Sequence, residues 1–378
     1  MTRELLYIGL MSGTSMDAVD AVLLAVAGNR CTVEGSLAQL MPDDLRADLM
    51  RLSQPGADHI DLLGATDRRL GMLFADTALA LIDRQDLTSN DITAIGSHGQ
   101  TIRHRPNPSD PTRHFSLQIS DPGTIAAITG ITTVADFRRK DMALGGEGAP
   151  LVPAFHQHVF RHPTNDRAVI NIGGIANITY LPHAGSDAPV IGFDTGPGNC
   201  LMDGWIERHL NKPFDDRGDW AASGRVDDAL LARLLGEPYL TRLPPKSTGR
   251  ETFNLRWLDG LLAALDEPPS SVDVQATLCR FSAASIAHGL TQLPAGGIPG
   301  EIYLCGGGAF NSQLVKDLAD ALPNTQIFTT AALGLDPRHI EGAAFAWLAH
   351  QTINRLPGSL ASVTGARRDA ILGGIYYA

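Results

Sequence analysis

The chain opens with two apolar segments, residues 5–10 and 21–26, that flank a short polar segment rich in small residues. The polar segment contains Ser12-Gly13-Thr14-Ser15-Met16-Asp17, and this order of apolar, polar and apolar residues predicts a β-hairpin. Small residues at a turn let backbone N–H groups approach an anion, and hydroxyl groups supply further donors. The tip of the hairpin therefore suits a phosphate group, although an ordinary polar turn accounts for the same residues.

Two carboxylates, Asp17 and Asp20, follow the small residues. Carboxylate oxygens are ligands that Mg²⁺ prefers in sites that also hold phosphate groups. No Gly-Lys-Ser/Thr sequence follows the glycine, so the segment is not a Walker loop. We therefore predict that residues 12–20 bind the phosphates of a nucleoside triphosphate and that Asp17 binds the accompanying Mg²⁺.

The composition indicates a soluble protein of two domains. Its 378 residues exceed one ordinary domain, and 44% hydrophobic and 19% charged residues are typical of globular proteins. A formal net charge of −11 argues against sequence-independent nucleic-acid binding, which needs a basic surface. The four cysteines are widely separated, and no apolar segment reaches the roughly 18 residues of a membrane helix. We expect a cytoplasmic protein with reduced thiols and with neither nucleic-acid nor membrane partners.

The order of apolar segments predicts two α/β domains, each with a mixed sheet flanked by helices. Hairpin strands open both halves, and the second set begins at residues 167–172. We predict that residues 1–131 and 365–378 form the first domain and that residues 132–364 form the second. Helical periodicity is found in residues 43–53, 64–84, 200–210, 227–235, 255–265, 274–293, 312–322 and 340–353.

Three segments rich in glycine or small residues follow predicted strands, at residues 12–17, 194–199 and 306–308. Open α/β sheets bind ligands at the ends of their strands. Together the three segments resemble the two phosphate loops and the adenosine loop of the actin-like sugar-kinase superfamily. That resemblance implies an actin-like ATPase fold with ATP in a cleft between two domains.

Longer motifs resemble one family of that superfamily, the anhydro-N-acetylmuramic acid kinases, in the family's order and over nearly the whole chain. The resemblance implies an enzyme that uses ATP, Mg²⁺ and water to open the 1,6-anhydro ring of anhydro-N-acetylmuramic acid and to phosphorylate O6. The product would be N-acetylmuramic acid 6-phosphate, an intermediate of peptidoglycan recycling, and the resemblance also implies a homodimer. The motifs are Gly9-Leu10-Met11-Ser12-Gly13-Thr14-Ser15-Met16-Asp17, Ser97-His98-Gly99-Gln100-Thr101, Asp136-Phe137-Arg138, Gly145-Gly146-Glu147-Gly148-Ala149-Pro150-Leu151-Val152-Pro153, Asn171-Ile172-Gly173-Gly174-Ile175-Ala176-Asn177 and Phe193-Asp194-Thr195-Gly196-Pro197-Gly198-Asn199.

The loops and the resemblance together imply a set of ATP-binding residues. One departs from the family, which usually has glycine where this chain has Ala18. A positive φ at that position would cost alanine roughly 1 kcal/mol, and we expect Ala18 to lie in the outgoing strand, where it is harmless. The set is Ser12, Gly13, Thr14, Ser15, Met16, Asp17, Ala18, Val19, Asp20, Gly173, Gly174, Asn177, Gly196, Gly198, Asn199, Gly306, Gly307 and Gly308.

Asp194 is the predicted general base. The reaction needs a group that takes a proton from the water attacking the anomeric carbon, and a carboxylate at a strand end beside glycines suits that task. Aspartate is also common where it caps a turn, so the residue by itself leaves both roles open. The family resemblance favours catalysis.

Four further residues are predicted to contact the sugar together with Asp194. Arg138 suits the lactyl carboxylate of the substrate and also a transferring phosphoryl group, although many loop arginines are merely solvated. His98 and Gln100 follow a predicted strand, where a histidine is often structural. Glu341 opens a predicted helix, where an acidic residue is favoured by the helix dipole alone.

Two other functions fit the same sequence features. One is a different sugar or acyl kinase of the superfamily, which transfers phosphate to an existing hydroxyl group. The other is an ATP-dependent sugar sensor without turnover, against which the aspartates of both phosphate loops argue, because a sensor needs no base.

Overall fold

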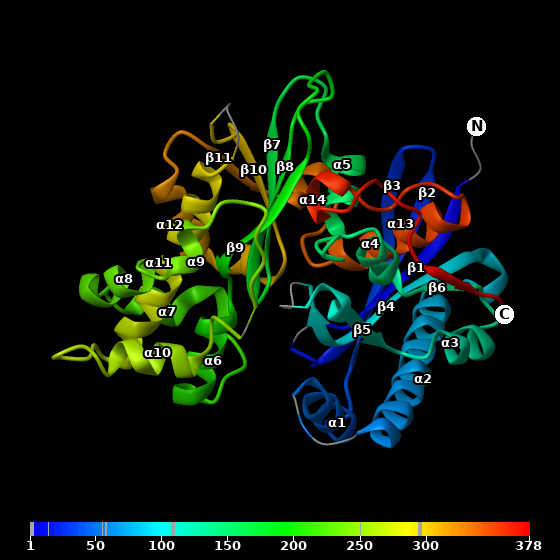
Figure 1. Cartoon of the computed structure of the whole chain (residues 1–378), viewed down its shortest axis with the longest axis horizontal. Helices are drawn as coiled ribbons and strands as arrows, with labels where there is room; N and C mark the ends of the chain where they lie inside the picture. The colour runs from blue at the N-terminus through cyan, green and yellow to red at the C-terminus, as the bar shows by residue number, and fades with distance from the viewer. Residues whose placement is uncertain are drawn as a thin grey trace. The chain divides into compact units, whose positions relative to one another are not determined.

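A computed structural model describes residues 4–13, 15–54, 56, 59–106, 110–249, 251–293 and 297–378, apart from the side chain of Pro111. The chain divides into two compact units. Unit 1 contains Met1–Val159 and His339–Ala378, and unit 2 contains Phe160–Arg338 (Figure 1). Both units are α/β, with a mixed sheet and flanking helices, so the predicted fold class is confirmed.

Seven strands form the sheet in the described part of unit 1. Their order is β12-β6-β4-β1-β2-β3, and β5 pairs with β4 beside this path. The pairs β1–β4 and β4–β6 are parallel, and the other pairs are antiparallel. The strands are β1 (Leu5–Met11), β2 (Ala18–Ala27), β3 (Arg30–Leu40), β4 (Ile92–Arg105), β5 (Phe115–Ile119), β6 (Thr133–Ala135) and β12 (Gly374–Tyr376).

Helices cover both faces of this sheet. Ile8 and Leu10 of β1 share a core with Phe74 of helix α2, whereas the alternate residue Gly9 faces helix α13. The helical segments of unit 1 are α1 (Asp43–Ser53), α2 (Ile60–Arg84), η1 (Ser89–Asp91), η2 (Pro111–Arg113), α3 (Pro122–Thr129), α4 (Phe137–Ala143), α5 (Val152–Phe160), α13 (Ile340–Ile353) and α14 (Ala361–Thr364).

Glycines bring α13 unusually close to the sheet. A Cβ atom added at Gly9 or Gly96 would overlap backbone oxygens of α13, and one added at Gly342 would overlap Val22. The helix therefore packs with its backbone almost directly on β1 and β4, an approach that side chains at these positions would prevent.

The boundaries of the units differ from the predicted boundaries at residues 131 and 365. β6 pairs with β4 and so extends unit 1 beyond residue 131. Phe155 of α5 contacts Trp347 of α13, with ring centroids 5.9 Å apart, so both helices belong to unit 1. An apolar helix pattern shows that a helix buries one face, but not which of two sheets it covers.

Unit 2 has a sheet with the order β11-β10-β7-β8-β9. The pairs β10–β11 and β10–β7 are parallel, and β7–β8 and β8–β9 are antiparallel. The strands are β7 (Arg167–Ile172), β8 (Ile175–Leu181), β9 (Ile191–Pro197), β10 (Glu301–Cys305) and β11 (Gln326–Thr329). The helical segments are α6 (Cys200–Leu210), η3 (Asp216–Gly218), α7 (Asp219–Ser223), α8 (Asp228–Leu235), α9 (Pro238–Thr241), α10 (Leu255–Leu262), α11 (Ser271–Thr291), η4 (Gly307–Phe310), α12 (Ser312–Ala321) and η5 (Thr330–Leu333).

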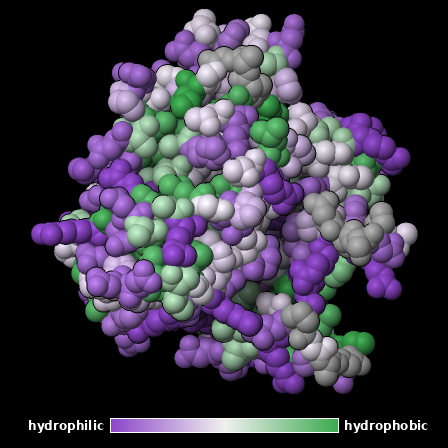
Figure 2. Space-filling model, turned by 60° about the vertical axis from the view of Figure 1, so that its left-hand side comes forward, coloured by the Kyte–Doolittle hydropathy of each residue, from purple (hydrophilic) through white to green (hydrophobic). Residues whose placement is uncertain are grey.

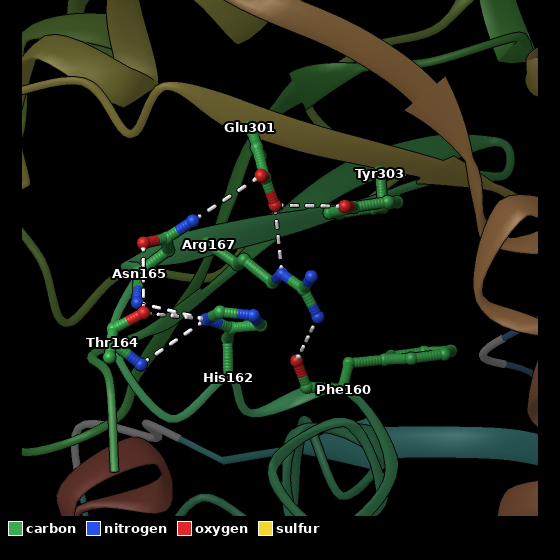
Figure 3. Close-up of polar contacts among 7 residues, drawn as sticks. All are labelled: Phe160, His162, Thr164, Asn165, Arg167, Glu301 and Tyr303. Carbon is green, nitrogen blue, oxygen red and sulfur yellow. Dashed lines mark hydrogen bonds and ion pairs between the residues drawn. The ribbon is translucent and has the colours of Figure 1, made fainter. Parts of the chain in front are cut away.

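An ion pair fixes the amino ends of the parallel strands in unit 2 (Figure 3). Arg167 of β7 lies opposite Glu301 of β10, and its Nε donates to Glu301 Oε2 at 3.0 Å. Its Nη1 donates to the carbonyl of Phe160 at 3.0 Å, and Tyr303 donates to the same Glu301 oxygen at 2.9 Å. Arg167 therefore connects the start of unit 2 to two neighbouring strands.

Hydrophilic residues predominate on the face shown in Figure 2, and hydrophobic residues form smaller patches between them. None of the helices in the described residues is long and apolar enough to cross a membrane.

The contact between α13 and the sheet predicts a large penalty for a small substitution. Gly96→Ala places a methyl group against the carbonyl of Phe345, and we expect the free energy of unfolding to fall by about 1–3 kcal/mol. Gly64→Ala is the matched control, because its Cβ would meet no atom within 4 Å in the helix α2. It should leave stability unchanged or raise it by about 0.5–1 kcal/mol. Urea denaturation of both variants tests this, and equal effects would contradict the proposed packing constraint.

Candidate functional site

The hairpin tip in unit 1 is held by its own polar groups. The buried hydroxyl of Ser12 donates to the carbonyl of Ala18 at 2.9 Å, and the Met16 N–H donates to the Gly13 carbonyl at 3.1 Å. Met16 has a φ of 55°, so the turn requires the left-handed region at this residue. Thr14 lies outside the described residues.

Ala18 begins β2 and pairs with Leu40 of β3, so the predicted strand position of Ala18 is confirmed. Val19 is fully buried in the core of unit 1, and its side chain therefore packs against apolar residues instead of facing a ligand. Asp20 pairs with Met11 across the hairpin.

The two carboxylates of the hairpin interact through their charges. Ser15 Oγ donates to Asp17, which is exposed. Burial of the Asp20 carboxyl group raises its pKa to about 6, and the negative charge of Asp17 adds a smaller effect in the same direction. No group of three potential metal ligands occurs among the described residues. The exposed carboxylate of Asp17 is an oxygen donor of the kind that Mg²⁺ takes beside phosphate groups.

Arg138 and His98 form the main polar pair of unit 1. Arg138 lies in α4, and its Nε and Nη2 donate to His98 Nε2 at 3.1 and 2.9 Å. The Nδ1 of His98 lies 2.9 Å from the carbonyl of Gly99, which can only accept, so Nδ1 carries the proton. Both ring nitrogens of His98 are therefore engaged within the protein, and the predicted contact of His98 with the sugar has no ring nitrogen available in this arrangement.

Burial and the Arg138 charge hold the pKa of His98 well below its usual range. Burial also lowers the pKa of Arg138 to about 10, while the negative charges of Glu341 and Asp141 act in the opposite direction. At neutral pH the pair therefore consists of a neutral imidazole that accepts from a guanidinium cation.

The glycine-rich segment 145–148 is anchored to Arg138 and Asp141. Arg138 Nη1 donates to the Gly148 carbonyl at 2.9 Å, and the Gly148 N–H donates to the fully buried Asp141 at 2.9 Å. Asp141 also accepts from Thr364 Oγ1 at 2.7 Å. Arg138 thus uses three of its five N–H donors on His98 and Gly148, which leaves one N–H on Nη1 and one on Nη2.

The two other residues predicted to contact the sugar lie in the same unit. Gln100 is buried in β4; its Nε2 donates to the Thr101 carbonyl at 3.2 Å, and its Oε1 has no hydrogen-bond partner in the described part of the chain. Glu341 is half-buried in the first turn of α13, and its charge acts on Arg138.

Asp194 lies in β9 of unit 2, within a row of polar residues across the sheet. Asn177 of β8 pairs with Asp194 on one side and with Asn171 of β7 on the other, so the three side chains share one face. All three are half-buried, whereas their neighbours Ile172 and Phe193 are fully buried. Asp194 is therefore a strand residue in a polar row, and its Oδ2 accepts a hydrogen bond from the Thr248 N–H at 3.0 Å.

The glycine segments of unit 2 converge at the carboxyl ends of β7 and β10. The N–H groups of Gly198 and Asn199 donate to the carbonyls of Gly174 and Gly173 at 2.9 and 2.8 Å. These two N–H groups hold the turns together and are not directed at an anion. Gly308 packs on Ile172 and beside Asn199, and Gly196, with φ 152°, packs on Ser285 of α11.

A pocket of about 370 Å³ lies beside this convergence. Small-molecule sites typically have volumes of roughly 300–1,000 Å³. Aromatic rings and guanidinium groups suit a flat heteroaromatic ring, and the Arg338 guanidinium lies 5.4 Å from the centre of the Phe310 ring. The pocket is lined by Asn199, Met202, Asp203, Phe214, Asp215, Asp216, Arg217, Gly307, Phe310, Asn311 and Arg338.

A larger pocket of about 520 Å³ lies at the opposite edge of the same sheet, at the amino ends of β7, β10 and β11. Its carboxylates, Asp166 and Glu301, are already bonded to Tyr180, Arg167 and Tyr303 (Figure 3 shows the Glu301 part). Size alone therefore does not identify the site, because none of the predicted site residues lines this pocket.

The sequence analysis missed the side chains that line the smaller pocket, including Phe214, Arg217, Phe310 and Arg338. They come from separate loops, and each looks like an isolated surface residue in the sequence. It also missed Lys246, which is buried beside Asp194. The flanking Pro-Pro and Ser-Thr-Gly residues indicate a loop, and this pattern could have drawn attention to the lysine.

The family model described as anhydro-N-acetylmuramic acid kinase matches residues 5–378. Relatives named anhydro-N-acetylmuramic acid kinase from Shewanella pealeana and Shewanella oneidensis are 50% and 51% identical to this chain over 370 and 372 residues, which is 98% of either chain in each pair. Among solved structures, component A of the (R)-2-hydroxyglutaryl-CoA dehydratase of Acidaminococcus fermentans is 11% identical, with a TM-score of 0.48 over 90% of this chain and 96% of that chain. A ROK family glucokinase from Streptomyces griseus, in complex with glucose and AMPPNP, is 14% identical, with a TM-score of 0.38 over 92% and 99%.

The neutral state of His98 predicts acid sensitivity. Because the folded pKa is depressed, the unfolded chain binds a proton below about pH 6.5 that the folded chain does not bind. The stability present above that pH is therefore lost as the pH falls towards the folded pKa, by up to about 1.4 kcal/mol per pH unit. His98→Gln keeps an acceptor for Arg138, and its unfolding free energy should fall less steeply from about pH 6.5 to about pH 5.

Urea denaturation at several pH values measures this slope. His209→Gln replaces an exposed histidine of unit 2 and should keep the wild-type slope. Equal slopes for wild type and His98→Gln would show that His98 does not couple folding to protonation.

Proposed function

The chain belongs to the anhydro-N-acetylmuramic acid kinase family and is a kinase of anhydro-N-acetylmuramic acid; we propose that it opens the 1,6-anhydro ring with water and phosphorylates O6 with ATP. The products are N-acetylmuramic acid 6-phosphate and ADP. The observation that carries this assignment is the family match over residues 5–378, together with about 50% identity to named relatives over 98% of the chain.

Arg138 is our proposed ligand of the lactyl carboxylate. His98 and Gly148 take three of its N–H donors, and the two that remain, one on Nη1 and one on Nη2, match the two oxygens of a carboxylate. The guanidinium stays charged at neutral pH, since burial lowers its pKa only to about 10. A fork held in place by a neutral histidine loses little entropy when it binds the substrate.

Asp194 is our proposed general base. Its carboxylate would take a proton from water as the water oxygen bonds to the anomeric carbon and the bond from that carbon to O6 breaks. The O6 atom then accepts the γ-phosphoryl group of ATP, and ADP leaves. A hydrogen bond of 3.0 Å from the Thr248 N–H to Asp194 Oδ2 fixes the direction of the carboxylate.

The pocket beside Gly307 and Phe310 is our proposed site for the adenosine end of ATP. Its volume of about 370 Å³, its two phenylalanines and its arginines fit a purine, and Asp203, Asp216 and Asn311 supply polar groups. We propose that the phosphates bind the hairpin tip, residues 12–17. When bound with the nucleotide, Mg²⁺ would neutralise phosphate charge, and Asp17 is the residue that would hold it.

Gln100 and Glu341 are proposed to contact the sugar. The Oε1 of Gln100 is a buried acceptor without a partner among the described residues, which suits a sugar hydroxyl or amide N–H. Glu341 lies close enough to Arg138 for their charges to interact, so it also helps to balance the charge of the arginine.

The function is tested by mass spectrometry of the products formed from ATP, Mg²⁺ and anhydro-N-acetylmuramic acid in ¹⁸O-water. We expect a phosphorylated sugar with one solvent oxygen, because ring opening places that oxygen on the anomeric carbon. Asp194→Asn should lower kcat by about 10² or more. Phosphorylation without solvent oxygen would indicate an ordinary sugar kinase, and no product at all would contradict the assignment.

A second prediction concerns Arg138. Arg138→Lys keeps the charge but loses the fork, and we expect KM for the anhydro sugar to rise by about 10-fold to 100-fold, with KM for ATP unchanged. The effect should vanish for 1,6-anhydro-N-acetylglucosamine, which lacks the lactyl carboxylate. Arg139→Lys is the matched control, since Arg139 is exposed on the same helix and pairs with Asp136. Equal losses for both sugars would exclude the carboxylate as the partner.

A further inference from the structure

Lys246 is the one buried lysine of the four in the chain. Its exposed fraction is 4%, whereas Lys140, Lys212 and Lys316 are exposed. Burial of an ammonium group is costly unless the charge is compensated nearby. The position of Lys246 therefore calls for an anionic or polar partner.

The direct contacts of Lys246 compensate the charge only in part. Its Nζ donates to the Leu240 carbonyl at 3.1 Å and lies 5.0 and 5.8 Å from the ring centres of Tyr239 and Phe193. An ammonium group has three N–H donors, and beside the one carbonyl acceptor Nζ contacts these two aromatic rings among the described residues.

The surroundings of Lys246 are also those of Asp194. Phe193 precedes Asp194 in β9, and Tyr239 donates its hydroxyl to the Asp194 carbonyl at 2.8 Å. The Asp194 N–H donates to the Lys246 carbonyl at 3.2 Å, and the Thr248 N–H donates to the Asp194 carboxylate at 3.0 Å. Residues 246–248 thus contact Asp194 through its backbone and through its carboxylate.

The charges agree with this arrangement. Burial, followed by the positive charge of Arg242, lowers the pKa of Lys246 to about 8, and the negative charge of Asp194 raises it. Lys246 is therefore mostly protonated at neutral pH. Since charge coupling is reciprocal, the ammonium must favour the ionised form of Asp194 to the same extent.

We propose that Lys246 is a positioning residue that holds Asp194 ionised and correctly oriented, so that it is ready to accept a proton from water. The proposal rests on the proposed role of Asp194 as general base. Among the residues that the structure describes, the groups with ionisable or charged side chains around the lysine are Asp194 on β9, Tyr239 on α9 and Arg242 after α9, and of these three only Asp194 can supply a negative charge at neutral pH.

Nuclear magnetic resonance of labelled lysine side chains tests the coupling without turnover. With four lysines in the chain, the Lys246 signal is assigned from Lys246→Arg. We expect Lys246 to titrate near pH 8 in the wild type and about one pH unit lower in Asp194→Asn, because the cation loses its anionic partner. An unchanged titration in Asp194→Asn would overturn the proposal, whether or not that variant is active.

The pH dependence of kcat/KM tests the consequence for catalysis. Lys246→Met should move the acidic limb of the profile to higher pH by about one unit. Lys246→Arg should keep the limb at its wild-type pH, because the arginine keeps the charge. Lys316→Met, at an exposed site of unit 2, should leave the profile unchanged. A lower rate with an unshifted limb would assign Lys246 a purely structural role, whereas an active Asp194→Asn would instead refute the proposed role of Asp194 as general base.

Discussion

The close packing of α13 on the sheet of unit 1 is the constraint on which the site of that unit depends. Gly96 lets the backbone of α13 approach β4, and this places the Phe345 ring 4.5 Å from the ring of His98. His98, held on one side by Phe345, accepts two hydrogen bonds from Arg138. A glycine far from Arg138 in the sequence therefore helps to set the direction of the guanidinium group.

Unit 2 uses a different principle to hold its catalytic candidate. Asp194 lies in a regular strand, and a separate loop, residues 246–248, bonds to its backbone and its carboxylate. A buried cation on the same loop interacts with the charge of the carboxylate. We propose that this one short segment controls both the orientation and the protonation state of Asp194.

Several predictions from the sequence are confirmed. The α/β class with mixed sheets, the membership of the kinase family and the strand position of Ala18 all agree with the structure or the comparisons. These features are local or repeated along the chain, since alternating apolar residues specify strands and a linear motif specifies a family. Three features were not predicted from the sequence. They are the division of the chain at Val159 and His339, the pocket beside Gly307 and Phe310, and the role of His98 as an acceptor for Arg138.

The sequence by itself determined the kinds of element and the family, and it pointed to Arg138 and Asp194 as the residues now proposed for the site. Only the tertiary structure decided what surrounds those groups. His98 lies 40 residues from Arg138, and Lys246 acts on Asp194 from a loop 52 positions later. Such pairs leave no spacing pattern along the chain, because they depend on which helix covers which sheet, and packing between distant segments settles that choice.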